Sequence, residues 1–254
     1  MAPKSNSEPS VQSVDRAIQI LRCFENGDKL GLTEISKAVG LHKSTTYGIV
    51  TTLKNNGFLE KVEDTGKYQL GVELFRIVST VQADLRDICR PHIRKLSEAT
   101  GETINLVVPD GIYVIYIEKQ ESDRSVKIST SIGKRLPMYC TGVGKAILAF
   151  LPQYEASSIL DKTKLIPFTK NTLTSKEDLI QQMAQTRENG YALDLEELEY
   201  GLVCIAVPIV NLKRQPVAAL SCSGPKQRMG NERLEIISAE MLQHAGEISR
   251  MLIF

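Results

Sequence analysis

The chain has 254 residues, with 31 Lys and Arg against 30 Asp and Glu, so its net charge of +1 does not by itself indicate a nucleic-acid binder. No segment approaches the roughly 18 consecutive apolar residues of a membrane-spanning helix. The five cysteines are odd in number and form no Cys-x-x-Cys pair, which argues against a disulfide framework and against a zinc motif.

The first ten residues, Met1–Ser10, are rich in Ser and Pro and contain no apolar block, so we expect a disordered tail rather than an export signal. We therefore expect a soluble, cytoplasmic protein. A first helix, ending near Asn26-Gly27, is predicted from apolar residues at helical spacing: Val14, Ala17, Ile18, Leu21 and Phe24.

Residues 32–57 are predicted to form two short helices joined by a tight turn. Thr33 is a suitable N-cap for the first helix, and Gly40 stands where a helix end favours a left-handed residue. The second helix begins near 42–44, and Asn56-Gly57 ends it. Its inward face is predicted to be Thr46, Ile49, Val50 and Leu53.

The opposite face of that second helix carries hydroxyls and an amide but no carboxylate, and the only charges between 42 and 57 are Lys43 and Lys54. Such a face can approach phosphates without repulsion and can contact base edges. The alternative is an ordinary helical hairpin in another all-α domain. We count nine basic against eight acidic residues in 1–70, so any DNA affinity must come from local arrangement.

A β-ribbon is predicted after the second helix, from Phe58 to Val62 and from Lys67 to Leu70, around an Asp-Thr-Gly turn at 64–66. Three helices followed by a ribbon is the order of a winged helix-turn-helix domain. Lys61 and Lys67 are candidates for DNA contact, and simple solubility explains these lysines about as well.

A linker helix over 72–90 is predicted from apolar residues spaced four and three apart: Leu74, Val78, Val81, Leu85 and Ile88. This seam suits packing against a helix of a second subunit, or against the protein's own second domain.

Pro91 suits the first position of a helix, which we expect to end at Thr100-Gly101. After this helix the chain alternates strands and helices, which predicts an α/β domain with a mainly antiparallel sheet. The predicted strands are 103–109, 112–119, 125–131, 191–195, 202–210 and 217–223, and Asp110-Gly111 between the first two predicts a hairpin. The predicted helices are 140–151, a helix opened by a Thr174-x-x-Glu177 capping box and ending at Asn189-Gly190, and 231–254. The last of these is expected to bury one apolar stripe: Leu234, Ile237, Met241, Ala245, Ile248 and Leu252.

Three local patterns bear on binding in this second domain. Thr141–Ala146 resembles part of a phosphate-binding loop but lacks its first glycine and its hydroxyl, so nucleotide binding is rejected, while carboxylate binding and close packing both stay open. Strand alternation places Leu202, Cys204 and Ala206 together on one face of their strand. It likewise places Val217, Ala219, Ser221 and Ser223 together on one face of theirs. The two serines suit a small polar ligand or a backbone contact at a strand end.

The third pattern is an acidic run from Asp194 to Glu199, for which a solvated loop is the default interpretation and acid–base chemistry is conceivable. The three histidines, His42, His92 and His244, are far apart and have no metal-ligand spacing. No metal or cofactor is predicted, although a metal site assembled by the fold is left open.

These segments together resemble the IclR family of bacterial transcription regulators. The matching stretches are 13–21, 31–61, 68–71, 90–103, 133–152, 189–209 and 219–225, among them GLTEISKAVGLHKSTTYGIV and MYCTGVGKAILAFLP. The resemblance implies an α+β chain with a winged helix-turn-helix head at 11–71, a linker helix at 72–90 and a GAF-like effector-binding domain at 91–254. It also implies a homodimer or a tetramer formed by two dimers, operator DNA as partner and a small organic acid as effector.

Carried over by position, the resemblance places DNA contacts at Lys43, Ser44, Thr45 and Tyr47. Thr51, on the same outer face, joins these candidates with the two ribbon lysines. Gly48 departs from the family, which commonly has Arg there. The implied effector pocket consists of Ile128, Leu136, Gly142, Val143, Asp194, Leu202, Cys204, Ser221 and Ser223.

We therefore expect an effector-controlled transcriptional regulator, most readily a repressor, and no enzyme. One alternative is a small-molecule enzyme with Cys140 or Cys204 as nucleophile and a regulatory head, for which no base is recognisable in the sequence. Another is a head domain used only for protein contacts.

Overall fold

The structure, a computed structural model, describes residues 11–25, 27–78, 83–127 and 130–252. The chain divides into two compact units, one ending at Ala83 and the other beginning at Asp84. The expected tail, Met1–Ser10, lies outside the described residues, and so does Ile128. In the parts of the chain that are described, no helix is both long and apolar enough to cross a membrane.

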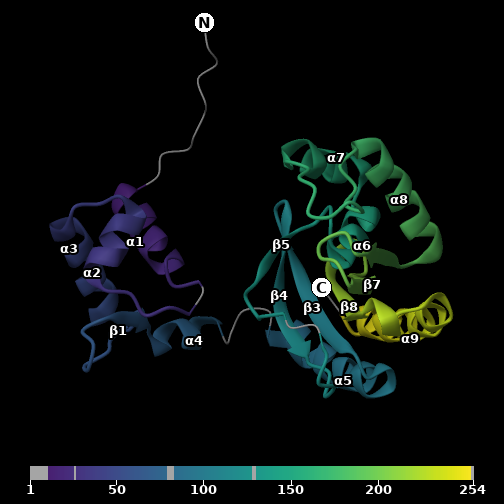
Figure 1. Ribbon diagram of the computed structural model, residues 1–254, viewed down its shortest axis with the longest axis horizontal. Helices are drawn as coiled ribbons and strands as arrows, with labels where there is room; N and C mark the ends of the chain where they lie inside the picture. Colours follow the sequence, from purple (N-terminus) through teal and green to yellow (C-terminus); the bar gives the residue numbers. More distant parts are fainter. Residues whose placement is uncertain (1–10, 26, 79–82, 128–129, 253–254) are drawn as a thin grey trace, which may run out of the picture. The chain divides into compact units, whose positions relative to one another are not determined.

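The first unit begins with three helices, α1 (Gln12–Arg22), α2 (Leu32–Val39) and α3 (Lys43–Asn55) (Figure 1). The predicted apolar stripe of α1 is confirmed in part: Phe24 is buried and Leu21 packs against the core, but Val14 and Ile18 are 54% and 43% exposed and Ile20, outside the predicted stripe, is buried. Apolar residues cover more than one face of this helix at helical spacing. The face that carries Ile20 and Leu21 packs in the core formed with the other two helices. The helix also ends earlier than predicted, at Arg22.

The start of α2 differs from the prediction as well. Gly31 is the residue before the first turn, and its amide donates to the carboxylate of Glu34 at 2.6 Å, so Thr33 lies inside the helix. Gly40 adopts a φ of +65° and ends α2 as predicted. The predicted inward face of α3 is confirmed, since Thr46 and Val50 are fully buried.

The predicted ribbon is confirmed as β1 (Leu59–Lys61) paired antiparallel with β2 (Tyr68–Leu70). Leu59 and Tyr68 anchor the ribbon in the core of the three helices, and Leu30 forms a bridge to Tyr68. Three helices and a ribbon therefore form one small winged helix-turn-helix unit.

The predicted linker helix is found as α4 (Val72–Val78) and the beginning of α5 (Ala83–Thr100), with residues 79–82 outside the described range. The predicted helix start at Pro91 is wrong, because α5 runs straight through it. Buried residues on both sides of Pro91, namely Cys89 and Ile93, hold the helix on the core, while Pro91 itself is exposed. Water can therefore solvate the carbonyl that loses its partner at the proline.

The second unit is built on one six-stranded sheet in the order β5-β4-β3-β8-β7-β6, with antiparallel neighbours throughout (Figure 1). Its strands are β3 (Thr103–Asp110), β4 (Tyr113–Gln120), β5 (Arg135–Pro137), β6 (Ala192–Leu195), β7 (Leu202–Val210) and β8 (Pro216–Pro225). Its further helices are α6 (Gly142–Phe150), α7 (Gln153–Lys162), α8 (Lys176–Asn189), the short 3-10 helix η1 (Lys226–Arg228) and α9 (Asn231–Met251).

Helices cover both faces of this sheet, and strand alternation decides which side chains meet which helices. On β7, Val203, Ile205 and Val207 pack with α5 and α9 in one core, whereas Ala206 packs with α6 in the other. The predicted shared face of β8 holds for Ala219, Ser221 and Ser223. It fails for Val217, which packs into the opposite core at a register shift between β7 and β8.

Other differences lie at edges and caps. The described residues of the predicted strand 125–131 form no strand, and the edge strand is β5 instead. Ser175 rather than Thr174 caps α8, since its hydroxyl accepts from the amide of Asp178 at 3.3 Å. Helix α7 was not predicted. Strands 103–109 and 112–119, the hairpin between them and the stripe along α9 are confirmed.

Candidate functional site

The outward face of α3 is the first candidate surface. Lys43, Ser44 and Thr45 in its first turn are exposed, and Tyr47 is 57% exposed although it is aromatic. Thr51, one turn further on, is half-buried. The five predicted contact residues of α3 thus lie on a single helix, and nothing acidic stands in its first turn.

The two ribbon lysines differ from each other. Lys61 is exposed, whereas Lys67 lies 3.4 Å from Glu34 in an ion pair with α2. Lys67 therefore helps to hold the ribbon against the helices, which is a structural role that the sequence did not indicate. Lys61 is free to extend from the ribbon toward a phosphate.

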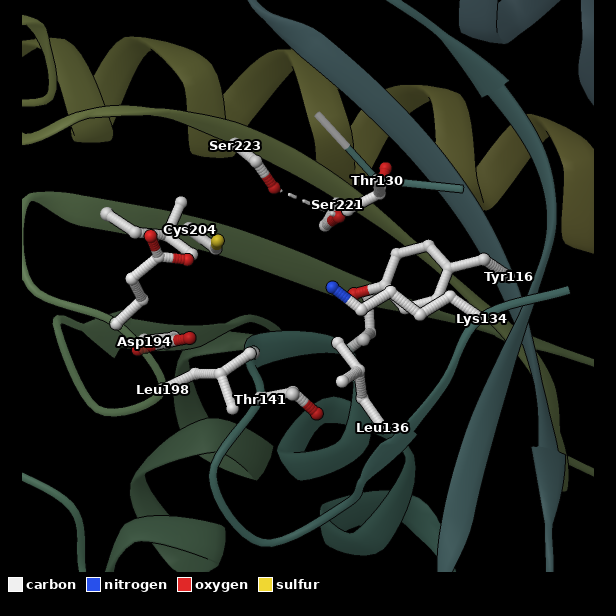
Figure 2. A pocket seen from close by; sticks show the side chains of 14 residues that line it. Tyr116, Thr130, Lys134, Leu136, Thr141, Asp194, Leu198, Cys204, Ser221 and Ser223 are labelled. Carbon is white, nitrogen blue, oxygen red and sulfur yellow. Dashed lines mark hydrogen bonds between the residues drawn. The ribbon is translucent and has the colours of Figure 1, made fainter. Parts of the chain in front are cut away.

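The second candidate site is a pocket in the other unit, between the first turn of α6 and the α6-facing side of β6, β7 and β8 (Figure 2). Its empty volume is about 480 Å³, which includes space open to solvent. Every predicted effector residue except Ile128, which is outside the described range, lines it: Leu136, Gly142, Val143, Asp194, Leu202, Cys204, Ser221 and Ser223.

Asn105, which sequence reasoning missed, organises the hydroxyls on one wall. Its side-chain oxygen accepts from the hydroxyl of Thr130 at 2.5 Å, so its NH₂ group must face the two serines of β8. That group donates to Ser221 Oγ at 3.2 Å and to Ser223 Oγ at 3.4 Å. The two hydroxyls also lie 3.5 Å apart and one of them donates to the other, so the pair keeps one hydroxyl hydrogen that can be donated toward the pocket.

Asp194 is the buried carboxyl group of the pocket, at 1% exposure. Burial raises its pKa from 3.8 to about 7, although the amide of Glu197 donates to its Oδ1 at 2.8 Å and Lys145 lies near. Lys145 itself forms a buried ion pair with Glu197. The default interpretation of the acidic run as a solvated loop is therefore wrong for Asp194, which is buried within β6, and for Glu197, which is buried in the turn that follows β6.

The first turn of α6 forms another wall. Thr141 caps the helix by accepting from the amide of Gly144 at 3.2 Å. Gly142 packs against β6 and β7, so that an added Cβ would already be in van der Waals contact with Ala206 at 3.4 Å. The amides that begin a helix have no partner within it and carry partial positive charge. The close-packing interpretation of the glycine-rich stretch is thus confirmed, and carboxylate binding by its amides, which border the pocket, stays a prediction.

Tyr116 and Lys134 were also missed, and Figure 2 shows the ends of both side chains directed into the same hollow. They come from β4 and from the loop before β5, which local pattern could not place. Asn105 carried a usable signal, because an amide inside the apolar run 103–108 must find a partner when buried. The remaining unpredicted lining residues are Thr130, Thr141, Leu198 and Glu199.

The thiols of the pocket region are poor nucleophiles. Burial and the charge of Asp194 raise the pKa of Cys204 well above its usual value, and burial raises the pKa of Cys140 to about 12. No histidine is among the described residues that line the pocket. These features weaken the enzyme alternative, which needs an activated thiolate and a base.

Both units match known sequence families. Residues 13–63 match the IclR helix-turn-helix domain, and residues 78–250 match the bacterial transcriptional regulator IclR C-terminal domain. The chain belongs to the IclR family. It is thus a member of a family of helix-turn-helix regulators of transcription, and the predicted resemblance is confirmed.

Full-length relatives agree with this assignment. The transcriptional regulator XynR of Escherichia coli is 40% identical over 250 residues, which cover 96% of this chain and 98% of XynR. The acetate operon repressor of Salmonella typhimurium is 36% identical over 94% of this chain and 89% of its own length. The crystal structure of Thermotoga maritima IclR, 32% identical, superposes with a TM-score of 0.78 over 95% of this chain and 99% of that one.

Proposed function

We propose that the protein is a cytoplasmic transcriptional repressor whose affinity for operator DNA changes when a small organic acid binds in the pocket. The observation that carries the ligand class is the set of hydrogen-bond donors around the hollow. The hydrogen-bonded pair Ser221 and Ser223 presents one hydroxyl hydrogen, the first turn of α6 presents amides, and Lys134 presents an ammonium. A carboxylate is the small group that accepts from several donors at once.

Asp194 fits this ligand class only because of its raised pKa. A carboxyl group that is half protonated near pH 7 can share its proton with a ligand carboxylate, whereas an ordinary aspartate would repel it. The lining side chains Leu136, Val143 and Leu202 offer apolar contacts to the carbon skeleton. These properties support a short organic acid with an apolar body, such as a keto acid or an aromatic acid.

The outer face of α3 supports the DNA side of the proposal. In a helix-turn-helix domain, the second helix of the motif enters the major groove with its N-terminal residues toward the bases. Lys43, Ser44, Thr45 and Tyr47 occupy that end of α3 and are exposed. We propose that two copies of the chain act together, because a symmetric pair reads two half-sites one helical turn apart.

Calorimetric titration of the full chain with a panel of keto acids and aromatic acids tests the ligand class. We expect one acid to bind saturably and its uncharged amide analogue to bind at least tenfold more weakly. The double variant Ser221→Ala, Ser223→Ala should lose at least tenfold in affinity for the acid, whereas Ser238→Ala, a buried serine of α9, should leave it unchanged. Failure of every acid to bind, or unchanged binding by the double variant, would exclude this pocket chemistry.

A further inference from the structure

Two of the three histidines meet in the folded chain, far from any motif spacing in the sequence. His92 on α5 and His244 on α9 are separated by 152 positions, yet their Nδ1 atoms lie 2.8 Å apart. Glu247, one turn after His244, places its Oε2 atom 3.6 Å from Nδ1 of His92 and 3.9 Å from Nδ1 of His244. This cluster lies with α5 and α9, which cover the face of the sheet opposite α6.

These distances suit one small metal ion. Ligand atoms about 2.1 Å from a tetrahedral zinc ion lie about 3.4 Å from one another. The three separations in the cluster, 2.8, 3.6 and 3.9 Å, lie on either side of that value, so shifts of about half an ångström would bring all three atoms to bonding distance. The i, i+3 spacing of His244 and Glu247 places both on one face of α9, toward α5.

The surroundings also suit a metal site. Both histidines are buried, which orients their imidazoles, while the side chain of Glu247 is 33% exposed and leaves a path to solvent. Gln243 donates to Oε1 of Glu247 at 3.0 Å, which holds the carboxylate with its other oxygen toward the histidines. Such outer hydrogen bonds fix the orientation of metal ligands.

We propose that His92, His244 and Glu247 bind a divalent ion of the zinc type and so clamp α5 onto α9. Two imidazole nitrogens and one carboxylate oxygen are typical ligands of Zn²⁺, and three protein ligands leave a fourth position for water. The nitrogen ligands disfavour Mg²⁺ and Ca²⁺, which prefer oxygen. The clamp acts on the helix with which the second unit begins.

Titration of the chelator-treated full chain with Zn²⁺, and separately with Co²⁺ followed by visible absorption, tests the site. We expect one equivalent to bind, the cobalt form to show the intense bands of a four- or five-coordinate ion, and the unfolding temperature of the second unit to rise. His244→Gln and Glu247→Gln should each weaken binding at least tenfold. Circular dichroism checks folding, and Glu247→Gln guards against misfolding because Glu247 is partly exposed.

Two control variants separate this site from other ligands. His42→Asn removes the exposed histidine of the first unit, and Cys23→Ser removes the cysteine that is not buried. Both should bind Zn²⁺ as the wild type does. If wild type binds no Zn²⁺, or if His244→Gln and Glu247→Gln bind it as tightly as wild type, the histidine pair is only a hydrogen-bonded contact and the proposal is overturned.

Discussion

At the scale of single residues, Asp194 makes the binding of an acid depend on pH. Its pKa of about 7 means that it is largely protonated at pH 6 and largely ionised at pH 8. Burial raises this pKa most; the backbone amides of Glu197 and Leu198 and the charge of Lys145 lower it, and the charge of Glu197 raises it. We expect the affinity for an organic acid to fall by about tenfold for each pH unit above 7, because a second negative charge then faces the ligand.

Calorimetry at pH 6, 7 and 8 measures this dependence, and Asp194→Asn should flatten it. The same shift affects folding. Because the pKa is raised above its unfolded value of 3.8, the folded state binds the extra proton, and stability falls as pH rises from about 4 to about 7. The Asn variant lacks this loss, which is at most about 4 kcal/mol for a shift of about three units. A steep pH profile in Asp194→Asn would contradict the assignment to Asp194.

Gly48 gives a second prediction at this scale. A side chain added there would meet nothing within 4 Å, so the outer face of α3 has room for the Arg that the family commonly carries. We expect Gly48→Arg to bind DNA about tenfold more tightly at low salt and with a steeper salt dependence, because one more cation reaches the phosphates.

The matched control is Gly48→Ala, which should stabilise α3 by about 0.5–1 kcal/mol without changing the salt dependence. Gel-shift titrations at several salt concentrations separate the two effects. Equal salt dependence in the Arg variant and the wild type would show that this face of α3 does not approach DNA.

At the scale of elements, α6 depends on a glycine that lets it approach the chain before it. A Cβ on Gly144 would lie 2.2 Å from the Cα of Met138, and backbone atoms cannot give way as a flexible side chain can. We expect Gly144→Ala to destabilise the second unit by about 3 kcal/mol or more, as other overpacked sites do. Gly246→Ala on α9, with nothing within 4 Å, should instead be neutral or stabilising.

Urea unfolding of both glycine variants measures the difference. If Gly144→Ala has the stability of the wild type, the first turn of α6 does not pack as closely against Met138 as the structure shows. The test also concerns the pocket, because the same turn supplies Gly142 and Val143 to its lining.

The elements that could be predicted from sequence are those with a strong period. Alternation on β7 placed Leu202 and Cys204 on the pocket side, and helical spacing along α9 identified its buried stripe from Leu234 to Leu252. Prediction failed where tertiary contacts override local preference. Pro91 continues a helix because the core holds both sides of it, and the bulge beside Val217 moves that residue to the other face.

The lining of the pocket could be predicted only in part from the sequence. Its strand and helix residues were found, because family resemblance and strand parity agree at Ser221 and Ser223. Tyr116, Thr130 and Lys134 were not found, since they reach the pocket only through the pairing of distant strands and the path of a loop. The histidine pair of α5 and α9 could not be predicted for the same reason, because its two members are 152 positions apart in the sequence.

At the scale of the whole molecule, the second half of the predicted apolar seam of the linker region packs on the protein's own second unit. Leu85 is buried and Ile88 packs in the core of the second unit, so this half of the seam follows the alternative of packing on the protein's own domain. Phe75 and Val72 on α4 are 76% and 71% exposed, which leaves them available for a second copy of the chain.

We expect Phe75→Ser to weaken self-association, with the folding of both units unchanged. Sedimentation at several protein concentrations measures the dissociation constant, which should rise at least tenfold. Tyr154→Ser, another exposed aromatic residue on α7, is the matched control and should have no effect. Equal association of the two variants would place the contact between copies elsewhere.

The central claim is that the pocket in one unit controls DNA binding by the other. The most direct measurement is a gel-shift titration on DNA from upstream of this gene and its neighbours, with and without the acid that calorimetry identifies. We predict selective binding whose midpoint the acid shifts by about fivefold or more, and a Ser221→Ala, Ser223→Ala variant that binds the same DNA without that response. Selective DNA binding that no pocket-bound acid alters would contradict the account.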